Sequence, residues 1–208
     1  MSIDLIEVKK LVSQILDSNT FVVSNGENAI IVDCGASIEE VKKATKGKKV
    51  VAILLSHGHF DHAYYLEEYV KEFGCKIYAN QNAKKSLSNP NLNYGEGFCI
   101  NDFSNFVWTN GDGEVEEGGM TIKYLYCPGH SNCLNVYQIG DLLFSGDCIF
   151  ARGIGRCDLA TSSVEQMLES LEKLDKIEFS TCYCGHYEDS DFDNIKRNIA
   201  AHIKYFRR

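Results

Sequence analysis

This 208-residue sequence lacks long apolar runs and has no surplus of positive charge. No stretch approaches the roughly eighteen apolar residues that a membrane-spanning helix requires, so we expect no membrane partner. The formal net charge is −8 at pH 7, and a nucleic-acid partner is not expected because phosphate binding requires concentrated positive charge. Residues 1–7 contain neither the basic nor the apolar region of a signal peptide, which predicts a cytoplasmic protein.

Paired cysteines at the spacing of a zinc knuckle are also absent, although the chain has nine cysteines. Cys182 and Cys184 are separated by a single residue and stand alone, whereas a zinc knuckle needs two pairs at wider spacing. Without an export signal, we interpret the cysteines as reduced thiols, most of them small buried hydrophobic residues. The length and the 44% apolar content suffice for one substantial core, and we expect a single domain over residues 1–208.

Histidine and aspartate are concentrated in one short segment after an apolar predicted strand. His57 and His59 are two residues apart, so on a nearly extended chain their side chains point to the same side and can hold one cation. Asp61 and His62 follow at the turn into a helix and suit a second cation beside the first. The alternative is that Asp61 caps the helix and the histidines are ordinary loop residues. Chance alone would give this pattern in about three of ten thousand such chains.

The rest of the chain alternates between predicted strands and helices. An Asn-Gly turn between two β-rich runs predicts a hairpin, and apolar residues at helical spacing predict the longer helices. Residues 89–113 show no period and are interpreted as an ordered loop near the mouth of an active site. The predicted strands cover residues 20–24, 29–32, 50–55, 76–80, 120–126, 134–139, 142–145 and 179–184, and the predicted helices cover 37–46, 66–73, 81–88, 162–174 and 192–206.

Three further ligand candidates each follow a later predicted strand. His130 lies on a Pro-Gly turn, Asp147 follows a glycine at the end of an apolar strand, and His186 comes directly after Gly185. Loops at the carboxyl ends of strands are where an α/β scaffold collects its catalytic groups. Together with the segment above, five of the six histidines and two aspartates are therefore candidate metal ligands.

Two polar residues are left out of this set. His202 lies between apolar residues of the last predicted helix and is interpreted as a residue of its polar face. Asp33 ends the strand at 29–32. It is interpreted as a turn-capping carboxylate rather than as a functional acid, because aspartate is common in turns.

Taken in order, these motifs resemble those of the metallo-β-lactamase superfamily, and within it the short, single-domain members of the glyoxalase II-like (hydroxyacylglutathione hydrolase-like) branch. The likeness runs from the corner at 32–35 to Gly185-His186. It implies an α/β fold, a four-layer αββα sandwich in which two mixed β-sheets are flanked by helices. It also implies a dinuclear site, in which one metal is held by His57, His59 and His130, the other by Asp61, His62 and His186, and both by a bridging Asp147.

The resemblance further implies a metal-dependent hydrolase of thioesters such as S-acylglutathione. Two zinc ions are expected, and iron or manganese would also fit histidine and aspartate donors. In this chemistry a hydroxide that bridges the metals attacks the carbonyl carbon, and Asp61 and Asp147 are the catalytic carboxylates that hold the metals. The expected partner is a small-molecule thioester, with glutathione conjugates as candidates. The sequence does not indicate an oligomeric state.

Arg156 is the candidate substrate-binding residue. It stands where glyoxalase II carries a lysine that contacts glutathione, so the resemblance implies that it binds a substrate carboxylate. An equal alternative is a loop arginine paired with Asp158. Two departures from glyoxalase II are clear: Asp158 replaces an aromatic residue, and only residues 187–208 follow His186, where that family has a helical domain.

The Gly-x-Gly-Arg-x-Asp stretch at 153–158 also resembles persulfide dioxygenases of the same fold. In that alternative, His57, His130 and Asp147 hold a single iron that activates oxygen. A non-catalytic zinc domain is disfavoured, because structural zinc sites are closed and mostly cysteine-rich. A nuclease is disfavoured by the acidic balance. The hydrolase is preferred over the dioxygenase because a complete set of ligands for two metals is present.

Overall fold

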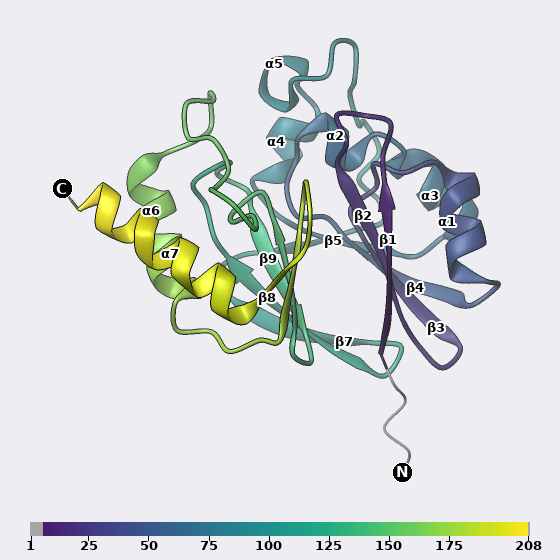
Figure 1. The fold of residues 1–208 in the computed structure, drawn as a ribbon. Coiled ribbons are helices and arrows are strands. Elements are labelled where there is room, and N and C mark those ends of the chain that lie inside the picture. Colours follow the sequence, from purple (N-terminus) through teal and green to yellow (C-terminus); the bar gives the residue numbers. More distant parts are fainter. Residues whose placement is uncertain (1–5, 208) are drawn as a thin grey trace.

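Apolar residues that alternate along the central strands give this chain three separate cores in the computed structural model, which describes residues 6–207. Two six-stranded sheets pack face to face, with helices on both outer sides (Figure 1). In chain order the elements are β1 (Glu7–Val12), β2 (Asn19–Asn25), β3 (Asn28–Val32), α1 (Ile38–Thr45), β4 (Lys49–Leu54), α2 (Phe60–Ala63), α3 (Leu66–Phe73), β5 (Lys76–Asn80), α4 (Ala83–Leu87), α5 (Pro90–Asn93), β6 (Phe106–Thr109), β7 (Gly113–Glu117), β8 (Met120–Tyr126), β9 (Asn135–Ile139), β10 (Leu142–Gly146), α6 (Val164–Leu174), β11 (Thr181–Cys184), β12 (Ser190–Asp191) and α7 (Phe192–Phe206).

The first sheet runs in the order β1-β2-β3-β4-β5-β6. Its first three strands pair antiparallel and the rest pair parallel. Because side chains alternate between the two faces of a strand, Ile31 packs in the cluster that includes Val41 of α1 and Tyr69 of α3, whereas its neighbours Ile30 and Val32 face the second sheet. Each central strand of this sheet therefore contributes to two cores.

The second sheet runs in the order β12-β11-β10-β9-β8-β7, and its pairs are antiparallel except for β10 with β11. Tyr137 and Phe144 face the first sheet, whereas Leu143 lies in the outer cluster with Leu171 of α6 and Ile199 of α7. Figure 1 shows α6 and α7 on one side of the molecule and α1 and α3 on the other. The four-layer αββα sandwich and its two mixed sheets are thus confirmed.

Helix α6 fixes the turn that carries one predicted ligand. It begins after Ser163, whose hydroxyl accepts a hydrogen bond from the backbone N–H of Gln166. The Ser163 N–H donates to the carbonyl oxygen of Gly129, at 2.8 Å, and the Ser170 hydroxyl donates to that of Pro128, at 2.6 Å. A Cβ on Gly129 would lie only 2.6 Å from the Cα of Met167, so only glycine allows this close approach.

Four strands are missing from the sequence prediction. β1, β6, β7 and β12 are the edge strands of the two sheets; β1 and β7 contain several charged residues, and β6 and β12 span only four and two residues. Edge strands carry such residues because only part of their surface is buried, so the alternation on which the prediction depends is weak. The interpretation of 89–113 as one loop is therefore wrong, since it contains α5 and β6. Val164, the first residue of α6, is 42% exposed, whereas Met167 and Leu171 of the same helix are buried.

Seven of the nine cysteines are buried, as expected, and Cys99 and Cys157 are partly exposed. Within residues 6–207, no helix combines the length and the apolar character needed to cross a bilayer. The prediction that no signal peptide is present concerns residues 1–7, and residues 1–5 of that segment lie outside the described part of the chain.

Candidate metal centre

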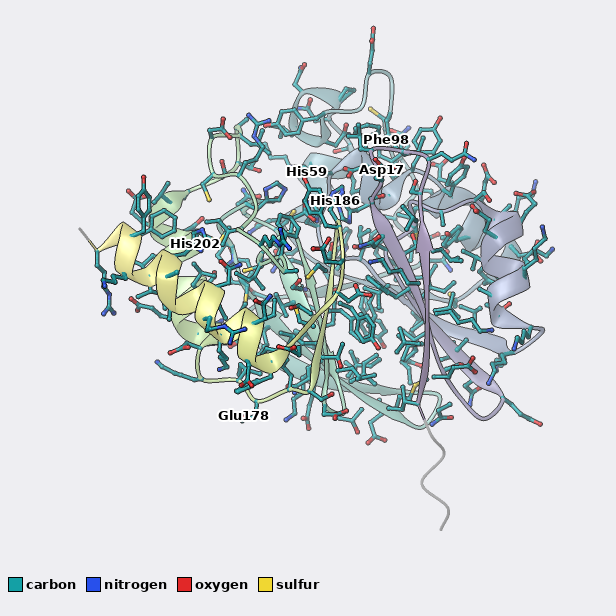
Figure 2. All side chains as sticks on the ribbon, in the orientation of Figure 1. Asp17, His59, Phe98, Glu178, His186 and His202 are labelled. Atoms are coloured by element: carbon teal, nitrogen blue, oxygen red, sulfur yellow. The ribbon has the colours of Figure 1, made fainter. Side chains whose placement is uncertain are left out.

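The seven predicted ligands meet at one edge of the sandwich, where strands of both sheets end. The loop after β4 and helix α2 supply four of them, and the loops after β8, β10 and β11 supply one each. Six are buried and His186 is partly buried. Figure 2 shows His59 and His186 in the same part of the molecule and His202 apart from them on α7. The exclusion of His202 on sequence grounds agrees with this position.

Three imidazole nitrogens form the first group. His57 Nε2 and His130 Nε2 each lie 3.0 Å from His59 Nδ1. All three side chains are buried, and their ligand atoms lie within 4.8 Å of one another. The expectation that His57 and His59 point to the same side is therefore met, and the Pro-Gly turn brings the third nitrogen to them.

The second group contains a carboxylate and two imidazoles. His62 Nε2 lies 3.3 Å from His186 Nε2, and Asp61 Oδ2 lies 3.2 Å from the latter. Asp61 is the second residue of α2 and provides no side-chain cap, which removes the alternative that it serves the helix alone. These ligand atoms also lie within 4.8 Å of one another.

Asp147 lies between the two groups. One carboxylate oxygen, Oδ1, is 3.3 Å from His62 Nε2, and the other, Oδ2, is 3.4 Å from His130 Nε2 and 3.5 Å from His186 Nε2. The strand end that carries it is closely packed, because a Cβ on Gly185 would overlap the Asp147 carboxylate. Glycine at that position lets the carboxylate reach both groups of imidazoles.

Hydrogen bonds on the far side of the rings fix the histidine tautomers. His130 Nδ1–H donates to the carbonyl oxygen of Arg156, at 2.9 Å, and His62 Nδ1–H donates to Asp33 Oδ2, at 2.8 Å. Because a carbonyl or carboxylate oxygen only accepts, each ring in its neutral form carries its proton on Nδ1. The lone pair of each Nε2 therefore faces into the site, as a metal ligand requires.

Asp33 corrects the sequence interpretation. Its backbone has φ of 61°, and its carboxylate, 2% exposed, accepts hydrogen bonds from the N–H (2.7 Å) and the hydroxyl (2.8 Å) of Ser56. The Ser56 oxygen also lies 3.0 Å from His57 Nδ1. Asp33 thus orients one histidine directly and another through Ser56, rather than capping its own turn. The sequence did contain one indication of this role, because Asp33 follows a predicted strand directly, as the predicted ligands do.

The electrostatics of the site favour a bound cation. Burial lowers the pKa of His57 well below its ordinary value and that of His59 to about 3, so these rings stay neutral. Burial also opposes charge on His62, but the carboxylates of Asp61 and Asp147 outweigh it and raise the pKa of His62 well above its ordinary value. The two carboxylates therefore stabilise positive charge at the centre of the group.

A cavity of about 270 Å³ opens above the ligands. Its walls include the side chains of Asp147 and four other ligands, together with Leu16, Tyr94 and Arg156. Arg156 forms a two-point ion pair with Asp158, at 2.6 and 2.7 Å, and both side chains are largely exposed. The structure thus shows the ion pair with Asp158 that one interpretation of Arg156 predicts. It also places Arg156 in the cavity wall, as the substrate-binding interpretation requires. Tyr94 was not singled out from the sequence.

Comparison with known proteins places the chain in a family. A model of the Metallo-beta-lactamase superfamily matches residues 14–186. The "Probable metallo-hydrolase YqgX" of Bacillus subtilis (strain 168) is 31% identical over 85% of this chain and 88% of its own length. The "Hydroxyacylglutathione hydrolase" of Shewanella pealeana is 27% identical over 92% of this chain but only 66% of that enzyme.

Solved structures have the same fold. The crystal structure of the BLEG-1 B3 metallo-beta-lactamase has a TM-score of 0.83 and 26% identity, over 90% of this chain and 95% of that one. ETHE1 from Myxococcus xanthus (TM-score 0.75, 18% identity, 97% and 90% of the chains) and TTHA1623 in a di-iron-bound form (TM-score 0.78, 24% identity, 91% and 98%) show the fold alone.

Proposed function

The chain belongs to the metallo-β-lactamase superfamily, and from this premise we propose that it is a dinuclear zinc-dependent hydrolase that cleaves thioesters such as S-acylglutathione. The observation that carries the proposal is the convergence of seven histidine and aspartate side chains into two groups with Asp147 between them. Histidine with carboxylate is the donor set of catalytic rather than structural zinc.

The arrangement of acceptor atoms supports cations at these positions. His62 Nε2 and Asp147 Oδ1 face each other at 3.3 Å, and the hydrogen bond to Asp33 places the proton of a neutral His62 ring on Nδ1. The two buried lone pairs would then repel one another, so the pair requires positive charge, either a proton on Nε2, as the raised pKa of His62 indicates, or a metal ion in its place. His57, His59 and His130 would hold one zinc and Asp61, His62 and His186 the other, with Asp147 shared. When bound, two such ions supply a hydroxide from water near neutral pH and polarise a carbonyl group.

The side chains of the protein would orient both the ligands and the substrate. Asp33 and Ser56 hold the rings of His62 and His57 in the tautomer that leaves Nε2 free. Arg156, at the edge of the cavity, would bind an anionic group of the thiol carrier. In the net reaction the oxygen of a water molecule bonds to the acyl carbon and the C–S bond breaks. The products are a carboxylate with its released proton and a free thiol. Thioester specificity is supported by the likeness to hydroxyacylglutathione hydrolase along most of this chain.

The first experiment measures metal identity and stoichiometry in protein purified without chelators or added metal. About two zinc ions per chain are expected, because two complete ligand groups are present. A single iron per chain, with oxygen consumed in the presence of glutathione persulfide, would overturn the proposal in favour of the mononuclear dioxygenase. In that outcome the group of Asp61, His62 and His186 would have no assigned role.

The second experiment tests the substrate class on the same preparation. Hydrolysis of S-lactoylglutathione and of simpler thioesters is followed by release of the free thiol, with a β-lactam as the comparison substrate. Preferential thioester cleavage is expected, and its loss after chelation and return after zinc addition would tie it to the metal. Preferential β-lactam cleavage would contradict the proposed substrate.

A further inference from the structure

One aromatic residue of the cavity is not among the metal ligands or the residues that orient them. Tyr94 follows α5 in the segment between β5 and β6, and its ring meets the imidazole of His59 edge to face, with ring centroids 5.2 Å apart. It is therefore in contact with the first group of ligands and also forms a wall of the cavity.

The backbone at Tyr94 is held in an uncommon conformation. Its φ and ψ are 63° and 15°, in the left-handed region, which bulky residues rarely adopt. Such strain costs on the order of 1 kcal/mol or more, and it persists only where the surrounding structure enforces it. The conformation ends α5, where the Tyr94 N–H donates to the carbonyl oxygen of Pro90, and it also sets the direction of the Tyr94 side chain.

The neighbouring residues enforce this conformation. The buried amide of Asn93 donates hydrogen bonds to the carbonyl oxygens of Ser86 and Phe98, both at 3.1 Å, and accepts one from the N–H of Gly95 at 2.8 Å. A Cβ on Gly95 would lie 2.6 Å from the Cβ of Phe60. Both residues beside Tyr94 are thus fixed, and its side chain has a defined direction.

The phenol of Tyr94 retains an unused donor. Its oxygen accepts a hydrogen bond from the backbone N–H of Ala160, at 2.7 Å, in the loop on the opposite side of the cavity. A phenol can accept and donate at once. Within residues 6–207 we find no acceptor for its hydrogen, and the residue is 41% exposed at the cavity. The O–H is therefore free to bind a molecule in the cavity.

We propose that Tyr94 is a substrate-specificity residue whose phenol O–H donates a hydrogen bond to an oxygen on the acyl carbon next to the thioester carbonyl. This inference rests on the proposed function. In that function the reacting carbonyl would lie among the predicted metal ligands and the thiol carrier would extend toward Arg156, so the proposal places the acyl carbon on the side of the carbonyl that faces Tyr94 and His59. The favoured substrates are then acyl groups with a hydroxyl or oxo group at that carbon.

The test compares two thioesters of glutathione that differ in one oxygen, the 2-hydroxypropionyl and the propionyl thioester. For each, kcat/KM is measured with the wild-type protein and with Tyr94→Phe. The wild type is expected to prefer the hydroxyacyl thioester by roughly tenfold, the contribution of one partly exposed hydrogen bond. Tyr94→Phe is expected to reduce this preference to about twofold or less, because it keeps the ring and removes the O–H.

The ratio of the two substrates separates binding from loop disruption. Tyr94→Phe also removes the acceptor of the Ala160 N–H, and a disturbed loop would lower both rates equally without changing the ratio. Tyr64→Phe is the matched control, since Tyr64 is 45% exposed and is not part of the cavity wall, and its ratio should equal that of the wild type. An unchanged preference in Tyr94→Phe would overturn the proposal.

Failure of the proposed function would be recognised separately. If the wild type cleaves neither thioester, the non-hydrolysable thioethers S-(2-hydroxypropyl)glutathione and S-propylglutathione are compared by titration calorimetry. Tighter binding of the hydroxylated thioether, lost in Tyr94→Phe, would support the role of Tyr94 without any reaction. Equal binding of the two thioethers by the wild type would overturn it.

Discussion

The two sheets supply the candidate metal centre in different ways. The first sheet contributes four ligands from a single stretch after β4, and the second contributes three, each from a different loop after β8, β10 or β11. Neighbouring positions in the sequence keep the first four together. Only the pairing of strands and the packing of α6 on the Pro-Gly turn bring the other three to them. One half of the centre is therefore assembled from neighbouring residues in the sequence, and the other half only by the pairing of strands in the folded chain.

Each half is nevertheless held by residues outside it. The local half depends on Asp33, which is 29 residues before His62 in the sequence. The half from the second sheet is joined to the first by Tyr137, whose hydroxyl lies 3.0 Å from the carbonyl oxygen of Leu55 and 2.9 Å from that of Tyr78. A compact motif in sequence is therefore no guarantee that its geometry is independent of the fold.

The largest expected effect comes from removing the residue that the two halves share. Asp147→Ala should lower metal content and reduce activity by more than about 100-fold, because it takes away the only carboxylate between the two groups within residues 6–207. Metal analysis and turnover on the same sample measure both effects. Asp193→Ala, which removes an exposed carboxylate on α7, serves as the control. Full turnover in Asp147→Ala would refute the bridging role.

A smaller effect is expected when the local half loses its distant support. In Asp33→Asn the amide would present an N–H to His62 Nδ1, which moves the ring proton to Nε2 and blocks a ligand position. Zinc affinity, measured by competition with a chelator, should fall about 10- to 100-fold. Asp175→Asn, at an exposed helix end, should leave it unchanged. An unchanged zinc affinity in Asp33→Asn would show that the histidines after β4 bind zinc without the hydrogen bond to Asp33.

The smallest effect is expected at the rim of the cavity. Arg156→Ala should raise KM for an anionic thioester by about two- to tenfold and leave the metal content unchanged, because exposed ion pairs contribute little free energy. Arg152, an exposed arginine near Glu188, provides the matched control, and Arg152→Ala should not alter KM. Unchanged kinetics in Arg156→Ala would show that Arg156 has no role in substrate binding and only forms an ion pair with Asp158.

The sequence predicted the buried parts of the fold and missed its edges. Central strands such as β3 and β4 are almost continuously apolar, and α6 and α7 repeat at helical spacing, so their burial left a clear pattern. The edge strands β1, β6, β7 and β12 bury less surface and left no such pattern. Short edge strands are specified mainly by their neighbours in the sheet, which a single sequence does not display.

The same contrast holds within the site. The ligands could be found because several of them are close together or stand beside glycines at strand ends. The role of Asp33 was missed although it also stands at the end of a strand, because its partner His62 is 29 residues away and aspartate is a common turn residue. Tyr94 gave no signal either, since its importance depends on a left-handed backbone and on a neighbour, His59, that only the fold brings near.

The start of β2 has a consequence for the order of events during synthesis. The backbone N–H and the side-chain amide of Asn19 donate to the carbonyl oxygens of Gly185 and Cys184, at 2.7 and 2.8 Å, and Ser18 pairs with His186. Residues that are synthesised before all seven predicted ligands thus hold the one of them that is synthesised last. A nascent chain that already displays the whole loop after β4 still lacks His186, so the complete centre forms only after β11 has been made and paired.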